Sequence, residues 1–153
     1  MNYVMNTNSL VKVYNNIQFI SSPKLDKLQW YIYVILNNNG DIKIGRSHDV
    51  ISRMRSLSNS NAGGSQIVKV AVSPPTYLRT YEGSLHNLYN KYRVPNSEWF
   101  KGLDFDIVVN EMEKYFNSEK YKCSNNLRKQ YGGYRSRNIY NNKTKKDDYF
   151  DEY

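Results

Sequence analysis

The chain has 153 residues and a formal net charge of +8, from 22 Lys and Arg against 14 Asp and Glu. A core of about 100 residues is usual for a small domain, so this length fits one globular unit with an appendage. The single cysteine, Cys123, excludes an internal disulfide and a cysteine zinc cluster, and no apolar run reaches the roughly 18 residues of a membrane span. We therefore expect a protein of a reducing cytoplasm with no membrane contact.

The first 29 residues form an extension that precedes the main domain. Leu10–Tyr14 and Ile17–Ile20 have the composition of two short strands, and Ser21-Ser22-Pro23 then breaks the pattern. We interpret residues 1–29 as an added β-hairpin or a small contact arm.

The next residues predict a second β-hairpin. Trp30–Leu36 and Asp41–Gly45 are apolar or alternating runs, and the intervening Asn37–Gly40 is typical of a tight turn. We expect a three-residue loop that is closed by Gly40 in the left-handed conformation.

The register of this hairpin decides which side chains share a face. It places Tyr33 opposite Gly45 and Ile35 opposite Lys43. Tyr33 and Lys43 are then diagonal neighbours, with Cα atoms about 7–8 Å apart, beside a glycine that leaves open space. The opposite face is apolar and consists of Ile32, Val34, Leu36, Ile42 and Ile44.

The remaining periodic segments complete an α+β domain over residues 30–116. They predict a helix capped by Ser47 or Asp49 that runs to about Ser58, a strand at Ile67–Val72, and helices at Tyr77–Tyr92 and Asp104–Phe116. We expect a small three-stranded antiparallel sheet flanked by helices.

From residue 117 to 153 the composition changes to a basic, tyrosine-rich tail with an acidic end. Nine basic residues and one acidic residue lie between 117 and 146, so this segment carries the chain's whole excess charge of +8. Because it has almost no aliphatic residues, we expect it to be flexible. Basic and aromatic side chains together can bind phosphates and stack on bases, although a solubilising tail stays an alternative. The candidates for DNA binding are Lys120, Lys122, Arg128, Lys129, Arg135 and Arg137 in the tail and Arg46 in the domain.

Five residues of the domain supply the groups that phosphodiester cleavage needs. Tyr33, Lys43, Arg53, Glu82 and His86 provide a phenol, an amine, a guanidinium, a carboxylate and an imidazole. Cleavage requires a base for water, a cation beside the developing charge and a carboxylate that holds a metal. These residue types therefore fit a nuclease.

The spacing of these residues resembles the GIY-YIG nuclease superfamily over roughly residues 30–100. The sequence is most similar to the branch common in phages and other viruses, whose motifs stand here as Lys43–Ser47 (K-I-G-R-S), Arg53, Glu82–His86 (E-x-x-x-H) and Glu98–Phe100 (E-W-F). The resemblance implies a DNA endonuclease that uses Mg²⁺ or Mn²⁺. It also implies a phage or viral origin, with the host cytoplasm or nucleoid as the place of action.

The resemblance also implies a role for each residue. Tyr33 would hydrogen-bond or deprotonate the attacking water, and Lys43 stands where most members have a tyrosine and some restriction enzymes use lysine as the base. Arg53 would stabilise the pentavalent phosphate, and Glu82 would be the single carboxylate ligand of the metal. His86 would shuttle a proton or position a phosphate.

Other interpretations stay open at this point. Tyr31 replaces the glycine of the first motif, which together with Lys43 favours an inactive module that binds DNA or RNA as a regulator. A third interpretation is that the chain is a viral protein-interaction factor. His86 can also be a structural partner of Glu82, and Glu98 either a second acid or an anchor for the turn that follows it. The oligomeric state is open, because one site cuts one strand and duplex cleavage needs a transient dimer, two encounters or a reorientation.

Overall fold

The computed structural model describes residues 8–60 and 66–138, and their side chains as far as residue 131. The elements in chain order are β1 (Lys12–Tyr14), the 3-10 helix η1 (Ile17–Phe19), β2 (Tyr31–Asn37), β3 (Ile42–Ser47), α1 (Val50–Ser60), β4 (Ile67–Val72), α2 (Tyr81–Leu88), the 3-10 helix η2 (Asn90–Tyr92), β5 (Trp99–Phe100), α3 (Phe105–Asn117) and α4 (Glu119–Asn138).

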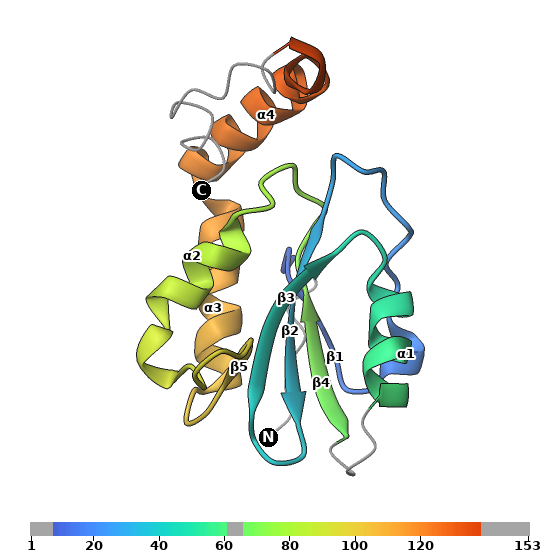
Figure 1. The fold of residues 1–153 in the computed structure, drawn as a ribbon. Coiled ribbons are helices and arrows are strands. Elements are labelled where there is room, and N and C mark those ends of the chain that lie inside the picture. Colours follow the sequence, from blue (N-terminus) through green and yellow to red (C-terminus); the bar gives the residue numbers. More distant parts are fainter. Residues whose placement is uncertain (1–7, 61–65, 139–153) are drawn as a thin grey trace.

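The sheet is antiparallel throughout, with the strand order β1-β4-β2-β3-β5. Helix α1 lies on one side of it, and α2 and α3 lie on the other (Figure 1). The expected α+β class is confirmed, but the three predicted strands are only the centre of a five-stranded sheet. The three-residue β1 lies within the predicted strand Leu10–Tyr14, which we had not assigned to this sheet, whereas the two-residue β5 was too short to separate from a loop by its pattern.

The predicted hairpin register is confirmed. Gly40 has φ 81° in the turn, Tyr33 pairs with Gly45, and Ile35 pairs with Lys43. The pleat therefore directs Tyr33 and Lys43 toward the side of α1, and the predicted apolar face toward α2 and α3. The apolar side chains of this face that are buried in a common core with α2 and α3 are Ile32, Val34, Ile42 and Ile44, with Leu36 packed against them.

The N-terminal extension does not form the expected hairpin. Residues 12–14 are β1, which pairs with β4, whereas Asn16 caps the 3-10 turn of η1 by accepting from the backbone N–H of Gln18. The backbone N–H groups of Leu10 and Val11 each donate at 2.8 Å to the carboxylate of Glu113 on α3. Strand β1 is therefore an edge strand of the same domain.

The predicted helices form with shifted ends. Helix α1 is capped by Asp49 as expected. Helix α2 starts four residues later than predicted, because Thr76 pairs with Trp30 as an isolated β-bridge and its hydroxyl accepts from the N–H of Leu78 in a tight turn. Leu88, the last residue of α2, is 55% exposed.

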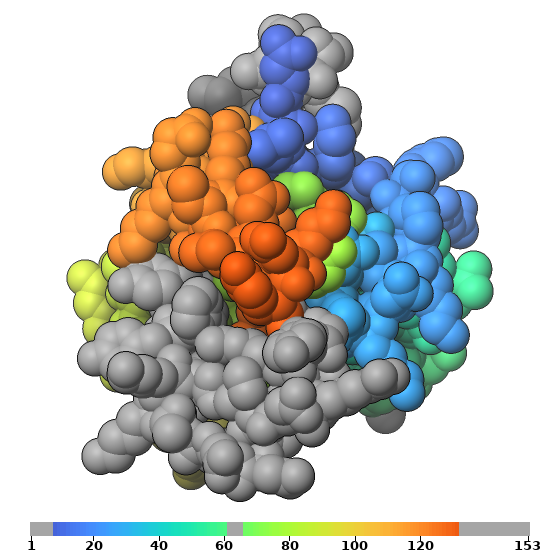
Figure 2. Space-filling model, turned by 90° about the horizontal axis from the view of Figure 1, so that it is seen from above, coloured from blue at the N-terminus to red at the C-terminus, as the bar shows by residue number. Residues whose placement is uncertain are grey.

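The expectation of a flexible tail from residue 117 is wrong for its first part. Glu119–Asn138 form α4, and Tyr121 is buried against Tyr115 and Phe116 of α3. Asn125 accepts hydrogen bonds from the Thr76 hydroxyl and the Tyr77 N–H, so α4 is joined to the segment that follows β4 (Figure 2). One buried tyrosine and one amide thus replace the aliphatic stripe that the sequence lacks.

The rest of that tail, residues 139–153, lies outside the described residues. Within the described ranges, the model contains no helix that is both long and apolar enough for a membrane span.

Candidate active site

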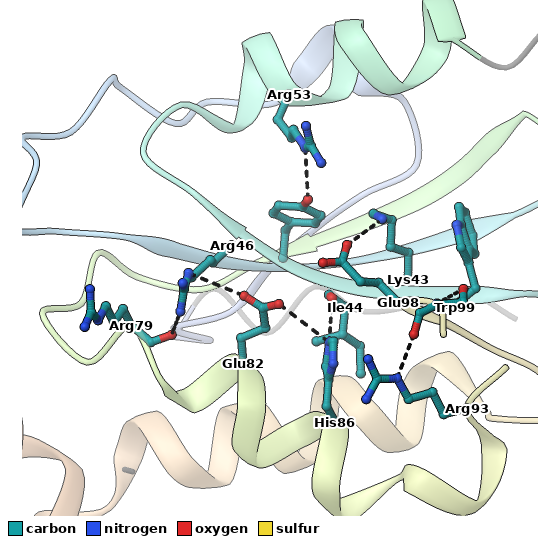
Figure 3. Close-up of polar contacts among 12 residues, drawn as sticks. Lys43, Ile44, Arg46, Arg53, Arg79, Glu82, His86, Arg93, Glu98 and Trp99 are labelled. Atoms are coloured by element: carbon teal, nitrogen blue, oxygen red, sulfur yellow. Dashed lines mark hydrogen bonds and ion pairs between the residues drawn. The ribbon is translucent and has the colours of Figure 1, made fainter. Parts of the chain in front are cut away.

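The candidate site lies at a free edge of the sheet. Strand β5 pairs with β3 only at Ile42 and Lys43, so the outer edge of β3 from Ile44 to Ser47 has no strand partner in the described part of the chain. Side chains from both faces converge here (Figure 3). We predicted a site on the face that holds Tyr33 and Lys43. Arg53 lies on the same side of the sheet, whereas Arg46, Glu82 and His86 lie on the side of α2.

The first component is a phenol beside a guanidinium. The Nε of Arg53, on α1, donates to the Tyr33 hydroxyl at 3.4 Å. Tyr33 is only 1% exposed, and a Cβ at Gly45 would overlap its hydroxyl. The open space expected beside Gly45 is therefore occupied by the Tyr33 ring. Burial raises the pKa of the Tyr33 phenol, and the nearby Arg53 opposes part of this effect.

The second component is an ion pair. The Nζ of Lys43 lies 2.7 Å from Oε2 of Glu98, and 5.6 Å from the ring centroid of Trp99. The Lys43 side chain is 9% exposed and that of Glu98 is 47% exposed. The hydrogen bond from Lys43 lowers the pKa of the Glu98 carboxyl. Glu98, which the sequence left open between two roles, is thus in contact with a predicted site residue.

The third component is the carboxylate of Glu82 on α2. Its side chain is 15% exposed, with Nε of Arg46 at 3.6 Å and Nε2 of His86 at 3.7 Å. Burial raises the pKa of Glu82, Arg46 and His86 counteract this, and the negative charge of Glu98 adds to the increase. The charge of Glu98 and those of the surrounding cations are therefore close enough to affect the ionisation of Glu82.

His86 connects α2 to the sheet edge. Its Nε2 donates to the carbonyl of Ile44 at 2.8 Å, and its ring meets Phe100 edge to face at 5.3 Å between centroids. The nitrogen nearest Glu82 is therefore already bonded to β3. This contact gives His86 a structural function at the site, whether or not it also takes part in chemistry.

The predicted DNA-binding residues of α4 are placed only in part. The side chains of Lys120, Lys122 and Lys129 are exposed and that of Arg128 is half-buried. The nearest charge to Lys122 is Glu119, at 3.5 Å. Arg135 and Arg137 belong to α4 by their backbone, and their side chains are not described.

Glu82 fits a divalent metal ion as a single protein ligand. The described residues contain no group of three or more His, Cys, Asp or Glu side chains that could enclose an ion. Mg²⁺, however, commonly binds through one or two carboxylates and completes its shell with water and phosphate oxygens. The two oxygens of Glu82 have no partner closer than 3.6 Å among its ion pairs, and its buried charge favours a cation.

Fold and site together define a small α+β domain with a cluster of cations and carboxylates at an open sheet edge. The chain belongs to the T5orf172 domain family, whose model matches residues 30–119. This phage-associated domain is related to nuclease-type domains and is linked to nuclease and DNA-binding functions. No curated protein and no solved structure matches the chain.

Proposed function

We propose that this protein is a metal-dependent DNA endonuclease that hydrolyses phosphodiester bonds with one active site per subunit. One observation carries the proposal: the Tyr33–Arg53 pair, the Lys43–Glu98 pair and Glu82 lie around the point on β3 where its pairing with β5 ends. A nucleophile-activating group, a phosphate-binding cation and a metal-binding carboxylate are thereby close enough for their charges to affect one another. The family assignment supports the same class of activity.

Arg53 stabilises the charge that develops on the phosphate. Only its Nε is bonded, to Tyr33, and its two Nη groups have no hydrogen-bond partner among the described residues. These donors are free to bind two oxygens of a pentavalent phosphate, because the planar guanidinium can donate two parallel hydrogen bonds.

Lys43 is the base in this proposal, and Tyr33 orients the water. The pKa of the Tyr33 phenol is raised, so the phenol stays protonated and Tyr33 acts through hydrogen bonds. In this step the proton of the Lys43–Glu98 contact, 2.7 Å long, moves to Glu98, and the amine of Lys43 takes a proton from water as the new oxygen–phosphorus bond forms. The bond between phosphorus and the leaving oxygen then breaks, and that oxygen keeps the electron pair and takes a proton from solvent.

Glu82 would hold Mg²⁺ or Mn²⁺, which when bound supplies Lewis-acid stabilisation of the leaving oxygen. His86 positions Glu82 by fixing α2 to the carbonyl of Ile44. Its position beside Glu82 and at the edge of β3 suits this role without requiring it to carry a proton.

A second candidate function is a nucleic-acid-binding module without catalysis. The observation in its favour is that both candidates for activating water are engaged: Tyr33 is 1% exposed, and Lys43 is in an ion pair. Such a module would bind DNA or RNA in a salt-dependent manner that survives Glu82→Ala, and would form no metal-dependent product.

Nicking of supercoiled plasmid with Mg²⁺ or Mn²⁺ separates the two functions. We expect wild-type protein to nick, and Arg53→Ala and Glu82→Ala each to lower the rate at least 100-fold, as loss of a charge-stabilising group usually does. Arg55→Ala is the matched control, because Arg55 is an exposed arginine of the same helix. Circular dichroism confirms that each variant folds.

If wild-type protein binds plasmid, single strands and branched DNA yet cuts none of them, nor RNA, the endonuclease is refuted and the binding module stands. Equal losses in Arg53→Ala and Arg55→Ala would also refute the assigned site, because any surface arginine would then serve.

A further inference from the structure

Arg46 is held in place by three different contacts. Its guanidinium carbon lies 4.9 Å from the ring centroid of Trp30, its Nη1 donates to the carbonyl of Arg79 at 3.0 Å, and its Nε lies 3.6 Å from Glu82. The remaining nitrogen, Nη2, has no hydrogen-bond partner among the described residues, and the side chain is 36% exposed. Arg46 thus lies beside Glu82 (Figure 3), with the two N–H groups of Nη2 available to a ligand.

Trp30 is itself anchored from two directions. Its backbone exchanges two hydrogen bonds with Thr76, at 2.8 and 2.9 Å. Its ring lies on the imidazole of His48, with centroids 3.6 Å apart, and Nδ1 of His48 is bonded to the carbonyl of Gln29. Trp30 therefore cannot follow Arg46 if the guanidinium moves, which makes the indole a rigid support.

The placement of these residues follows from the hairpin. Ile32 pairs with Arg46 in the β2–β3 register, so Trp30, two residues before Ile32, continues the same face and is a diagonal neighbour of Arg46. This face points toward α2 and Glu82. Because Trp30 already supports His48 and Arg46, we do not treat its ring as a stacking surface for a base.

We propose that Trp30 is a positioning residue, which holds Arg46 as a preorganised binding group for a phosphate next to the one that Arg53 contacts. This inference rests on the proposed function in so far as the ligand is a nucleic-acid backbone. Stacking on indole holds a guanidinium by its face and leaves its edge donors available, which is the geometry that a phosphate needs. The substrate would then be held by arginines from both sides of the β3 edge.

A double-mutant cycle tests this inference without relying on cleavage. Affinity for a short DNA duplex is measured by fluorescence anisotropy in EDTA, over a series of salt concentrations, for wild type, Trp30→Leu, Arg46→Ala and the double variant. We expect Arg46→Ala to reduce the slope of log K against log salt by about 0.9, the value for one lost phosphate contact. Trp30→Leu should weaken binding about two- to fivefold, the range of one exposed cation–π contact.

The decisive result is the effect of Trp30→Leu in the Arg46→Ala background, where we expect no further loss. Trp30→Phe retains an aromatic face and should restore most of the affinity, and Phe19→Leu is the matched control, because Phe19 is a 74% exposed aromatic residue. If Trp30→Leu fails to fold, the cycle is run with Trp30→Phe and Arg46→Lys. Phenylalanine offers a smaller aromatic face and lysine lacks a planar guanidinium, so the losses of DNA affinity should again be non-additive.

Additive losses would overturn the inference, because Trp30 would then contribute independently of Arg46. An unchanged affinity in Trp30→Leu would overturn it as well. Failure of the endonuclease proposal is distinguishable: plasmid nicking would be absent while the cycle in EDTA still showed coupling. Coupling with normal nicking supports both proposals.

Discussion

Gly45→Ala should destabilise the domain, because the space that an alanine needs is already occupied. A Cβ at Gly45 would lie 2.5 Å from Cζ and 2.9 Å from Cε2 of Tyr33, well inside van der Waals contact. Tyr33 is 1% exposed in the layer beneath α1, so its ring has no free volume into which to move. Gly83 is the matched control, because a Cβ there meets nothing within 4 Å.

The expected size of the effect follows from two opposing contributions. Overpacking a filled core costs about 1–3 kcal/mol. Replacing glycine by alanine within a strand recovers about 0.5–1 kcal/mol of backbone entropy. At the middle of both ranges the net loss in the free energy of unfolding is about 1.3 kcal/mol, or a fall in Tm of about 3–5 °C for a chain of this size. Gly83→Ala, in α2, should instead gain about 0.5–1 kcal/mol.

Urea and thermal denaturation followed by circular dichroism measure both variants. The nicking assay gives a second comparison, because displacing Tyr33 breaks its contact with Arg53, whereas Gly83→Ala leaves the site intact. A Gly45→Ala protein as stable as wild type would refute the reasoning, since it would mean that Tyr33 does not lie across Gly45.

Three further predictions concern the acid, the N-terminal strand and the last helix. Burial raises the pKa of Glu82 above its ordinary 4.5, so the folded protein binds the proton of this carboxyl more tightly than the unfolded chain does. The free energy of unfolding relative to Glu82→Gln, measured by urea titration, should therefore fall as the pH rises from 4.5 through the folded-state pKa of Glu82. Glu113→Ala should cost about 1–2 kcal/mol and increase hydrogen exchange in β1, whose preceding N–H groups lose their acceptor. Asn125→Ala should cost about 1–2 kcal/mol and make α4 sensitive to proteolysis, whereas Asn126→Ala at an exposed position should change stability by less than about 0.5 kcal/mol.

The central hairpin could be predicted from sequence because its determinants are local. The turn needed a left-handed residue, Gly40 supplied it, and the alternation on both sides then allowed one register. The strand at Ile67–Val72 and the capped start of α1 are likewise signals contained within a few residues.

The pairing at the sheet edges and the last helix could not be predicted because they depend on distant partners. The strand that contains β1 was predicted, but its pairing with β4 and the bond from Val11 to Glu113 join segments far apart in the sequence, and β5 has only two residues. Helix α4 lacks an apolar stripe and is joined to the domain by Tyr121 and Asn125, whose partners lie on other elements. Composition alone therefore indicated a flexible tail.

For the candidate site, motif spacing identified residue types but not their pairing. Lys43 and Glu98 are 55 positions apart, and nothing local to either predicts a 2.7 Å contact. The hydrogen bond from His86 to Ile44 could not be predicted from the pattern of side chains, because its acceptor is a backbone carbonyl. Trp30 was read only as the first residue of a strand, although an aromatic residue diagonal to an arginine on one face was a usable signal.

The shortness of β5 is the feature of the fold that permits a site at this edge. Unpaired strand edges tend to pair with other chains, and proteins usually protect them with charged or covering side chains. Here His86 occupies the Ile44 carbonyl and Arg46 places a cation alongside, while β5 covers only the first two residues of β3. Such protection disfavours another strand but not a phosphodiester backbone, which carries anionic oxygens and cannot extend a β-ladder. If β5 continued along β3, it would take the Ile44 carbonyl from His86 and cover the edge beside Arg46 and Glu82, so the proposed chemistry requires a short β5.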